Sequence, residues 1–124
     1  MQHRDHRPQP PILNEEECRG FQGAIELVGR RWSGAILLAL SRGASRFGQI
    51  IASVDGLSDR LLSQRLKELE AAGIVIRTIV PTTPAHSLYS LSPRGRELMA
   101  ALQPLVEWGV AELRESTSRE DATR

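Results

Sequence analysis

Cysteine is nearly absent from this chain, which has Cys18 alone among its 124 residues. A single cysteine excludes an intrachain disulfide and a metal site built from paired cysteines. Long hydrophobic runs are missing too, because no apolar segment approaches the ~20 residues of a membrane-spanning helix. Residues 1–11 are polar and rich in proline, unlike a secretory signal. We therefore expect a soluble, cytoplasmic protein.

Motifs of enzyme chemistry are also missing. The sequence has no HExxH, no phosphate-binding P-loop and no G-x-S-x-G. Its three histidines, His3, His6 and His86, are too scattered to suggest a metal or catalytic site. We therefore predict that the chain is not an enzyme and has neither a cofactor nor a metal.

The charge that is present is unevenly distributed along the chain. Residues 29–67 carry seven arginines and lysines against two aspartates, a net charge of +5, whereas residues 14–28 carry four glutamates and one arginine, or −3. A basic segment suits a nucleic-acid partner, because cationic side chains displace the counterions condensed on phosphates. A solvated surface with scattered arginines is the alternative that charge alone leaves open.

The order of elements predicts one domain with a real hydrophobic core. Helices are expected at about residues 14–29, 31–41, 47–53, 58–72 and 92–114, and strands at 74–80 and 87–91. Asn14, Ser58 and Ser92 are suitable N-caps, and Gly73 is a suitable end for the fourth helix. Residues 1–13 are expected to be a disordered tail, 14–116 the domain, and 117–124 a polar C-terminal tail.

Two short helices joined by a glycine turn and followed by a hairpin describe a winged helix-turn-helix. The predicted fold class is α+β and mostly helical, with a two-stranded β wing and additional N- and C-terminal helices. Such a fold presents its second short helix to the DNA major groove.

The helix at 58–72 has two distinct faces. Leu62, Leu66 and Leu69 share one face and are expected to be buried. The outward residues can pair with base edges or phosphates, and we predict DNA contacts there by Ser58, Arg60, Ser63, Gln64 and Lys67. A solvated face, or a module that binds another protein, is the alternative. An apolar face would favour the protein-binding module, so this polar face argues against it.

Arginines outside this helix are candidates for contacts that position the protein on DNA. Arg46, at the start of the third helix, is expected to meet a phosphate. Arg30 and Arg31 are weaker candidates, and the alternative for them is solvation or pairing with the acidic first helix.

Several short segments together resemble one known family. Residues 29–32 (GRRW) are similar to its G-G-K-W stretch, and residues 46–50 (RFGQI) to its R-F-N-E-L. Residues 56–70 are similar to its recognition-helix block, residues 89–95 to its Y-S-L-T…G, and residues 107–109 (EWG) to a motif in its last helix. The resembled family is the HxlR family of winged helix-turn-helix regulators. The resemblance covers residues 18–115. It implies a bacterial, homodimeric regulator that binds double-stranded DNA, expected to be a repressor, with dimer contacts from the first and last helices.

An apolar stripe on the last helix supports a dimer independently. Leu98, Leu102, Leu105 and Trp108 recur at helical spacing, and Leu113 continues the stripe. A helix at the end of the chain has little of its own domain left to pack against. We expect the dimer interface to include Phe21, Leu102, Leu105 and Trp108; packing against the first helix is the alternative.

The wing departs from the family pattern. The family tip reads P-x-V-P-P-K-V-E-Y, whereas here alanine replaces the second tip proline, His86 replaces the lysine and Leu88 replaces the glutamate. A neutral histidine attracts phosphate less than lysine does, so we expect the wing contact at His86 to be weaker or pH-dependent.

Control of binding is suggested by Cys18. It matches a position where many members of the resembled family have a cysteine, some of which sense oxidants or electrophiles. The neighbouring Arg19 favours a reactive thiolate, but Cys18 also lies on the apolar stripe with Phe21 and Ile25, where cysteine is a small core residue. A small-molecule effector is a further alternative.

Overall fold

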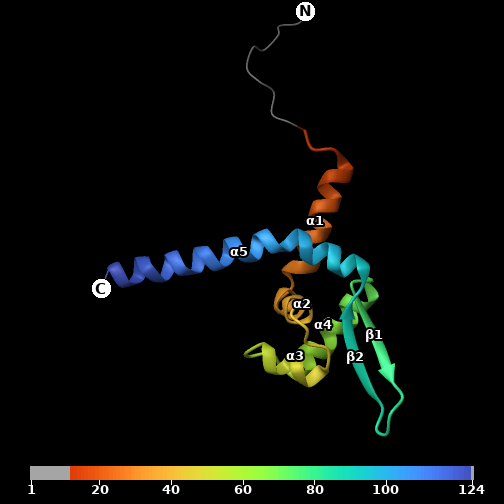
Figure 1. The fold of residues 1–124 in the computed structure, drawn as a ribbon. Coiled ribbons are helices and arrows are strands. Elements are labelled where there is room, and N and C mark those ends of the chain that lie inside the picture. Colours follow the sequence, from red (N-terminus) through yellow and green to blue (C-terminus); the bar gives the residue numbers. More distant parts are fainter. Residues whose placement is uncertain (1–11, 124) are drawn as a thin grey trace, which may run out of the picture.

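The computed structural model describes residues 12–123. Along the chain these residues form five helices and two strands: α1 (Glu15–Gly29), α2 (Ser33–Ser41), α3 (Phe47–Ser53), α4 (Asp59–Ala71), β1 (Val75–Val80), β2 (His86–Leu91) and α5 (Pro93–Ala122) (Figure 1). The predicted winged helix-turn-helix order is confirmed. The tail predicted at residues 1–13 lies, apart from its last two residues, outside the described residues, as does Arg124.

Local capping chemistry explains where three helices begin. The side-chain oxygens of Asn14, Ser58 and Ser92 accept hydrogen bonds from backbone N–H groups three residues later, at 2.6, 3.1 and 3.0 Å. Each bond satisfies a donor that has no partner within its helix. At the end of α4, Gly73 has φ 75°, a left-handed conformation that glycine adopts without a steric penalty. All four predictions are confirmed.

Two helix boundaries differ from the sequence prediction. Helix α2 begins at Ser33 rather than near Arg31, because Trp32 takes a left-handed backbone with φ 78°. Helix α5 continues to Ala122 rather than ending near Arg114, so the polar segment after residue 116 is helical through that residue. Ion pairs of Arg119 with Glu112 and Glu115, at 3.4 and 3.8 Å, link successive turns of this extension.

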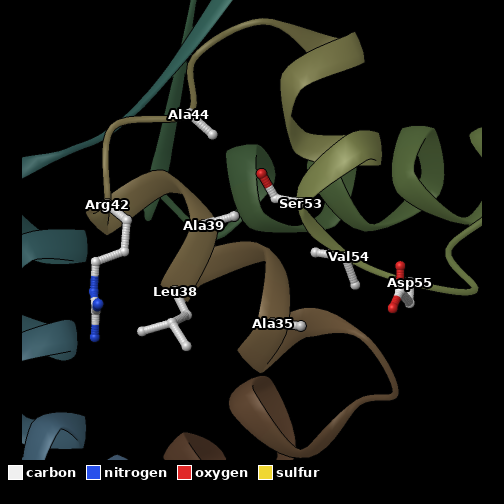
Figure 2. A pocket seen from close by; sticks show the side chains of 8 residues that line it. All are labelled: Ala35, Leu38, Ala39, Arg42, Ala44, Ser53, Val54 and Asp55. Carbon is white, nitrogen blue, oxygen red and sulfur yellow. The ribbon is translucent and has the colours of Figure 1, made fainter.

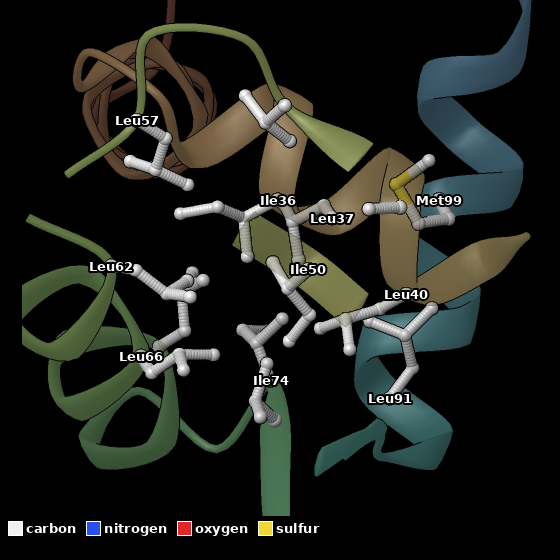
Figure 3. Close-up of a cluster of buried hydrophobic side chains, with 14 residues drawn as sticks. Ile36, Leu37, Leu40, Ile50, Leu57, Leu62, Leu66, Ile74, Leu91 and Met99 are labelled. Atoms are coloured by element: carbon white, nitrogen blue, oxygen red, sulfur yellow. The ribbon is translucent and has the colours of Figure 1, made fainter. Parts of the chain in front are cut away.

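The hydrophobic core lies between α2, α3, α4 and the start of the wing. Leu62, Leu66 and Leu69 of α4 are almost completely buried, as predicted, against side chains that include Ile36 and Ile50 (Figure 3). Strands β1 and β2 pair antiparallel in a register that runs from Val75 opposite Leu91 to Val80 opposite His86. The core thus fixes α4 with its other face directed to solvent.

The two terminal helices are only partly joined to this core. No residue of α1, from Glu15 to Gly29, is fully buried, and the buried residues of α5, Gly95 and Met99, lie near its start. Beyond them α5 projects away from the domain (Figure 1). Within residues 12–123, no helix is both long and apolar enough to cross a membrane.

Candidate nucleic-acid interface

The outward face of α4 brings together three of the predicted DNA contacts. Arg60, Gln64 and Lys67 are all exposed and lie opposite the buried leucines. Ser58, also exposed, stands at the N-cap, where its oxygen is already engaged with the N–H of Leu61. Ser63 is half-buried at the flank of the helix. The face therefore presents cationic and amide donors of the kind that pair with base edges in a major groove.

Arg65, which the sequence analysis counted with the basic surface, is buried. Only 9% of its surface is exposed, its Nε donates to the backbone carbonyl of Arg31 at 2.9 Å, and its Nη1 donates to both carboxylate oxygens of Glu68 at 3.2 and 3.3 Å. Its position on the helix was a signal of this, because it lies only about 60° from Leu62 around the axis. Arg65 thus joins α4 to the turn between α1 and α2 and does not belong to the outward face of the helix.

The other two early arginines, Arg30 and Arg31, are exposed, which agrees with the solvated alternative. Arg30 pairs with Glu68 of α4 at 3.5 Å, rather than with the acidic first helix. Arg31 lies over the ring of Trp32, 5.1 Å from its centroid, a cation–π contact. Both side chains therefore contribute to the packing around the turn between α1 and α2.

Arg46 is exposed and lies beside the wing. Its backbone forms an isolated bridge with Leu88, and the neighbouring Ser45 carbonyl accepts from the N–H of Tyr89 at 2.7 Å. The side chain of Gln49 accepts from the N–H groups of Ser45 and Arg46, both at 3.0 Å. These bonds join the segment that carries Arg46 to β2, so the exposed Arg46 side chain lies beside the wing.

The wing carries one side chain that was predicted as a DNA contact, His86, and one arginine that was not. His86 is half-buried, with Nδ1 3.2 Å from the Thr82 hydroxyl, which itself donates to the carbonyl of Pro84 at 2.9 Å. The hydroxyl has one hydrogen, so Nδ1 of His86 is the donor in this pair. Arg77 of β1 is exposed and donates from Nε to Ser87 across the hairpin at 2.9 Å. The sequence analysis missed Arg77, because the strand was interpreted by its β-branched residues alone.

Apolar side chains gather on the outer faces of the terminal helices. Phe21 of α1 is 71% exposed, and Leu105 and Trp108 of α5 are 54% and 64% exposed. Leu102, predicted with them, is half-buried and packs on the core. Cys18 is an exposed free thiol in an open hollow of about 510 Å³ that Leu13, Phe21 and Ile25 also line. Within one chain Cys18 is therefore not a core residue.

A second hollow of about 420 Å³ lies between α2 and the end of α3 (Figure 2). Small apolar side chains such as Ala35, Ala39 and Val54 form much of its lining, and Arg42 and Asp55 lie at opposite ends of it. The Ser53 hydroxyl, also in the lining, donates to the carbonyl of Gln49 at 2.7 Å. A mostly apolar lining is usual in small-molecule sites. That a small-molecule effector binds the protein stays a prediction.

Comparison with known proteins gives consistent matches. A family model described as HxlR-like helix-turn-helix matches residues 27–117. The HTH-type transcriptional regulator YvaP of Bacillus subtilis is 39% identical over 97 residues, which are 77% of this chain and 90% of YvaP. YodB of the same organism is 37% identical over 91 residues, 73% of this chain and 81% of YodB.

Solved structures agree with these matches. The structure of diamide-treated YodB superposes with a TM-score of 0.66 at 36% identity, covering 76% of this chain and 93% of that one. The redox regulator HypR in its reduced form gives a TM-score of 0.73 at 28% identity, covering 80% and 98%. The fold and the sequence therefore point to the same group of regulators.

Proposed function

Because the chain belongs to the HxlR-like helix-turn-helix family of DNA-binding transcriptional regulators, we propose that it binds specific duplex DNA sequences as a homodimer and represses transcription. The observation that carries this proposal is the outward face of α4, where exposed Arg60, Gln64 and Lys67 lie opposite a fully buried leucine seam. A dimer that covers two half-sites occupies promoter DNA, which is the simplest route to repression.

The proposed contacts divide into two kinds. The recognition helix α4 and its N-cap contact base edges, or lie beside those contacts, through Ser58, Arg60, Ser63, Gln64 and Lys67. Arg46, together with Arg77 and His86 of the wing, meets phosphates, which orient the protein without reading sequence. Arg46 and the wing share one rigid backbone unit, so they approach the same stretch of DNA.

Alanine substitutions on α4 test the proposal. Replacing Arg60 or Gln64 by alanine is expected to weaken binding to the preferred duplex by about 1–3 kcal/mol and to relax preference at one position in each half-site. The preferred duplex is the one that the wild-type protein enriches most from a random library, and a scrambled duplex is the reference. Affinities of both are measured over a salt series.

Arg46→Ala is the matched comparison, because it also removes an exposed arginine. It is expected to weaken binding to both duplexes alike and to flatten the salt dependence, since fewer counterions are released. If Arg60, Gln64 and Lys67 can all be replaced by alanine with affinity for the preferred duplex intact, α4 does not read DNA. A winged-helix module that binds another protein would then be the better description.

For Cys18 we propose control by oxidants. Two relatives are a redox regulator and a regulator solved after diamide treatment, and Cys18 is exposed on the apolar face of α1. Arg19, the expected activating neighbour, pairs instead with Glu15 at 3.5 Å. Diamide is expected to lower the DNA affinity of the wild-type protein at least severalfold and to leave Cys18→Ser unaffected. An equal response of both proteins would exclude Cys18 as the sensor.

A further inference from the structure

The turn between α1 and α2 holds the recognition helix at three points. The side chain of Arg30 pairs with Glu68 at 3.5 Å, and the carbonyl of Arg31 accepts from Arg65 at 2.9 Å. The ring of Trp32 lies under Gly56, in the turn that leads into α4, where an added Cβ would stand 3.2 Å from the Trp32 Cη2 atom. Three successive residues thus contact both the approach to α4 and its middle.

The conformation of Trp32 shows that this turn is held by its contacts. Its φ of 78° is unfavourable for a residue with a Cβ, so the surrounding packing has to maintain it. Within residues 12–123 the buried indole Nε1 has no hydrogen-bond partner, so the contacts of the ring there are packing contacts. The turn therefore has one fixed geometry against which α4 is set.

Glu68 is the centre of the polar part of this arrangement. Its carboxylate accepts from Arg65 Nη1 and pairs with Arg30, and the amide of Gln64 lies at 3.5 Å, at the long limit of a hydrogen bond. Arg65 bridges the carboxylate to the Arg31 carbonyl from a nearly buried position. Charge-assisted bonds in such shielded places are stronger and more directional than those at an open surface.

We propose that Arg65 and Glu68 are positioning residues that fix the orientation of the recognition helix and so determine DNA specificity without contacting a base. The proposal rests on the proposed function of α4 in reading DNA. A small rotation of α4 would displace Arg60, Gln64 and Lys67 from the base edges together, whereas contacts to phosphate, which depend less on geometry, would persist. Loss of the Arg65–Glu68 contacts is therefore expected to reduce selectivity more than overall affinity.

Glu68→Gln gives the sharpest test, because positioning and plain electrostatics predict opposite signs. Removing a negative charge beside DNA raises affinity for any duplex if only electrostatics operate. If Glu68 positions α4, affinity for the duplex enriched by the wild-type protein falls about fivefold, while affinity for a scrambled duplex stays level or rises. Glu70→Gln is the matched control, since it removes the same charge from another side of the same helix and should leave the ratio of the two affinities unchanged.

Arg65→Lys is the second variant and separates positioning from direct contact with phosphate. Lysine keeps the positive charge but cannot bond Arg31 and Glu68 together through a planar fork, so the selectivity ratio is expected to fall about tenfold. The slope of affinity against salt concentration should stay as in the wild type. Thermal unfolding of each variant identifies any loss that is due to unfolding.

The outcomes separate this proposal from the one on which it rests. A wild-type protein that shows no preference for any duplex overturns the proposed function itself. A selective wild-type protein whose selectivity is unchanged in both folded variants overturns the role of Arg65 and Glu68 alone. Should Arg65→Lys fail to fold, the Glu68→Gln ratio still decides the matter, because the Glu68 side chain is 30% exposed and glutamine has nearly the same shape.

Discussion

At Gly95 the start of α5 passes so close to the chain before β1 that a side chain has no room. An added Cβ would collide with the carbonyl oxygen of Ile74. The same carbonyl accepts from the N–H of Ser92 at 2.9 Å, and the Ser92 hydroxyl donates to the carbonyl of Gly73 at 2.6 Å. Backbone groups held in this way cannot yield easily, so the contact joins the end of α4 to α5.

Gly95→Ala is therefore expected to destabilise the fold. Overpacking against fixed backbone costs about 1–3 kcal/mol, and in a domain of this size each kcal/mol lowers the melting temperature by roughly 4 °C. Gly23→Ala is the control, because among residues 12–123 a Cβ at Gly23 would meet no atom within 4 Å beyond its own helix backbone and chain neighbours, and alanine favours helix. Thermal unfolding by circular dichroism should show a clear decrease for Gly95→Ala and none for Gly23→Ala; equal melting temperatures would contradict the role of Gly95.

Single residues also mark the limit of what the sequence can predict. The caps at Asn14, Ser58 and Ser92 depend on groups three residues away, so they could be identified from the sequence. The partner of Arg65 is a carbonyl 34 residues away, which only the folded chain brings near. For that reason the outward face of α4 could be predicted, but the contacts behind it could not.

At the scale of elements, α4 is held near its middle and at its C-terminal end by segments remote in sequence. Arg94, in the first turn of α5, donates from Nη1 to the carbonyl of Ala72 at 3.1 Å. The α1–α2 turn holds the middle of α4 through Arg65, and Trp32 packs under Gly56 in the turn before α4. The orientation of α4 therefore depends on α5 and on the turn that follows α1, and α1 and α5 are the helices that carry exposed apolar side chains.

Element type was predictable here, and two element boundaries were not. Leucines and isoleucines at helical spacing, followed by β-branched runs, predicted the order of five helices and two strands. The start of α2 depends on the packing of Trp32 under Gly56, and the length of α5 on ion pairs between its turns. In the wing, the contact between Arg77 and Ser87 depends on strand register, which the sequence did not specify.

At the scale of the whole molecule, the exposed apolar surface is concentrated on α1 and α5. Phe21, Leu105, Trp108 and Leu113 would remain in water in a single chain. Apolar groups clustered in this way usually mark a surface for another protein. A second copy of the chain is the proposed occupant, because a symmetric dimer presents two recognition helices to two half-sites.

Charge substitution on α5 tests this assembly. Leu105→Glu and Trp108→Glu are expected to convert a dimer into a monomer at micromolar concentration, because each would place a carboxylate in an apolar contact. Both side chains are more than half exposed in the single chain, at 54% and 64%, so its own core should be little affected.

Ala100→Glu adds the same charge at an exposed position about 140° around α5 from Leu105 and about 80° from Trp108, and should remain dimeric. Sedimentation velocity measures the assembly, and affinity for the preferred duplex should fall along with it, since two half-sites are no longer bound together. A wild-type protein that sediments as a monomer at micromolar concentration would contradict the proposed homodimer. If Leu105→Glu and Trp108→Glu both remain dimeric, the interface lies elsewhere.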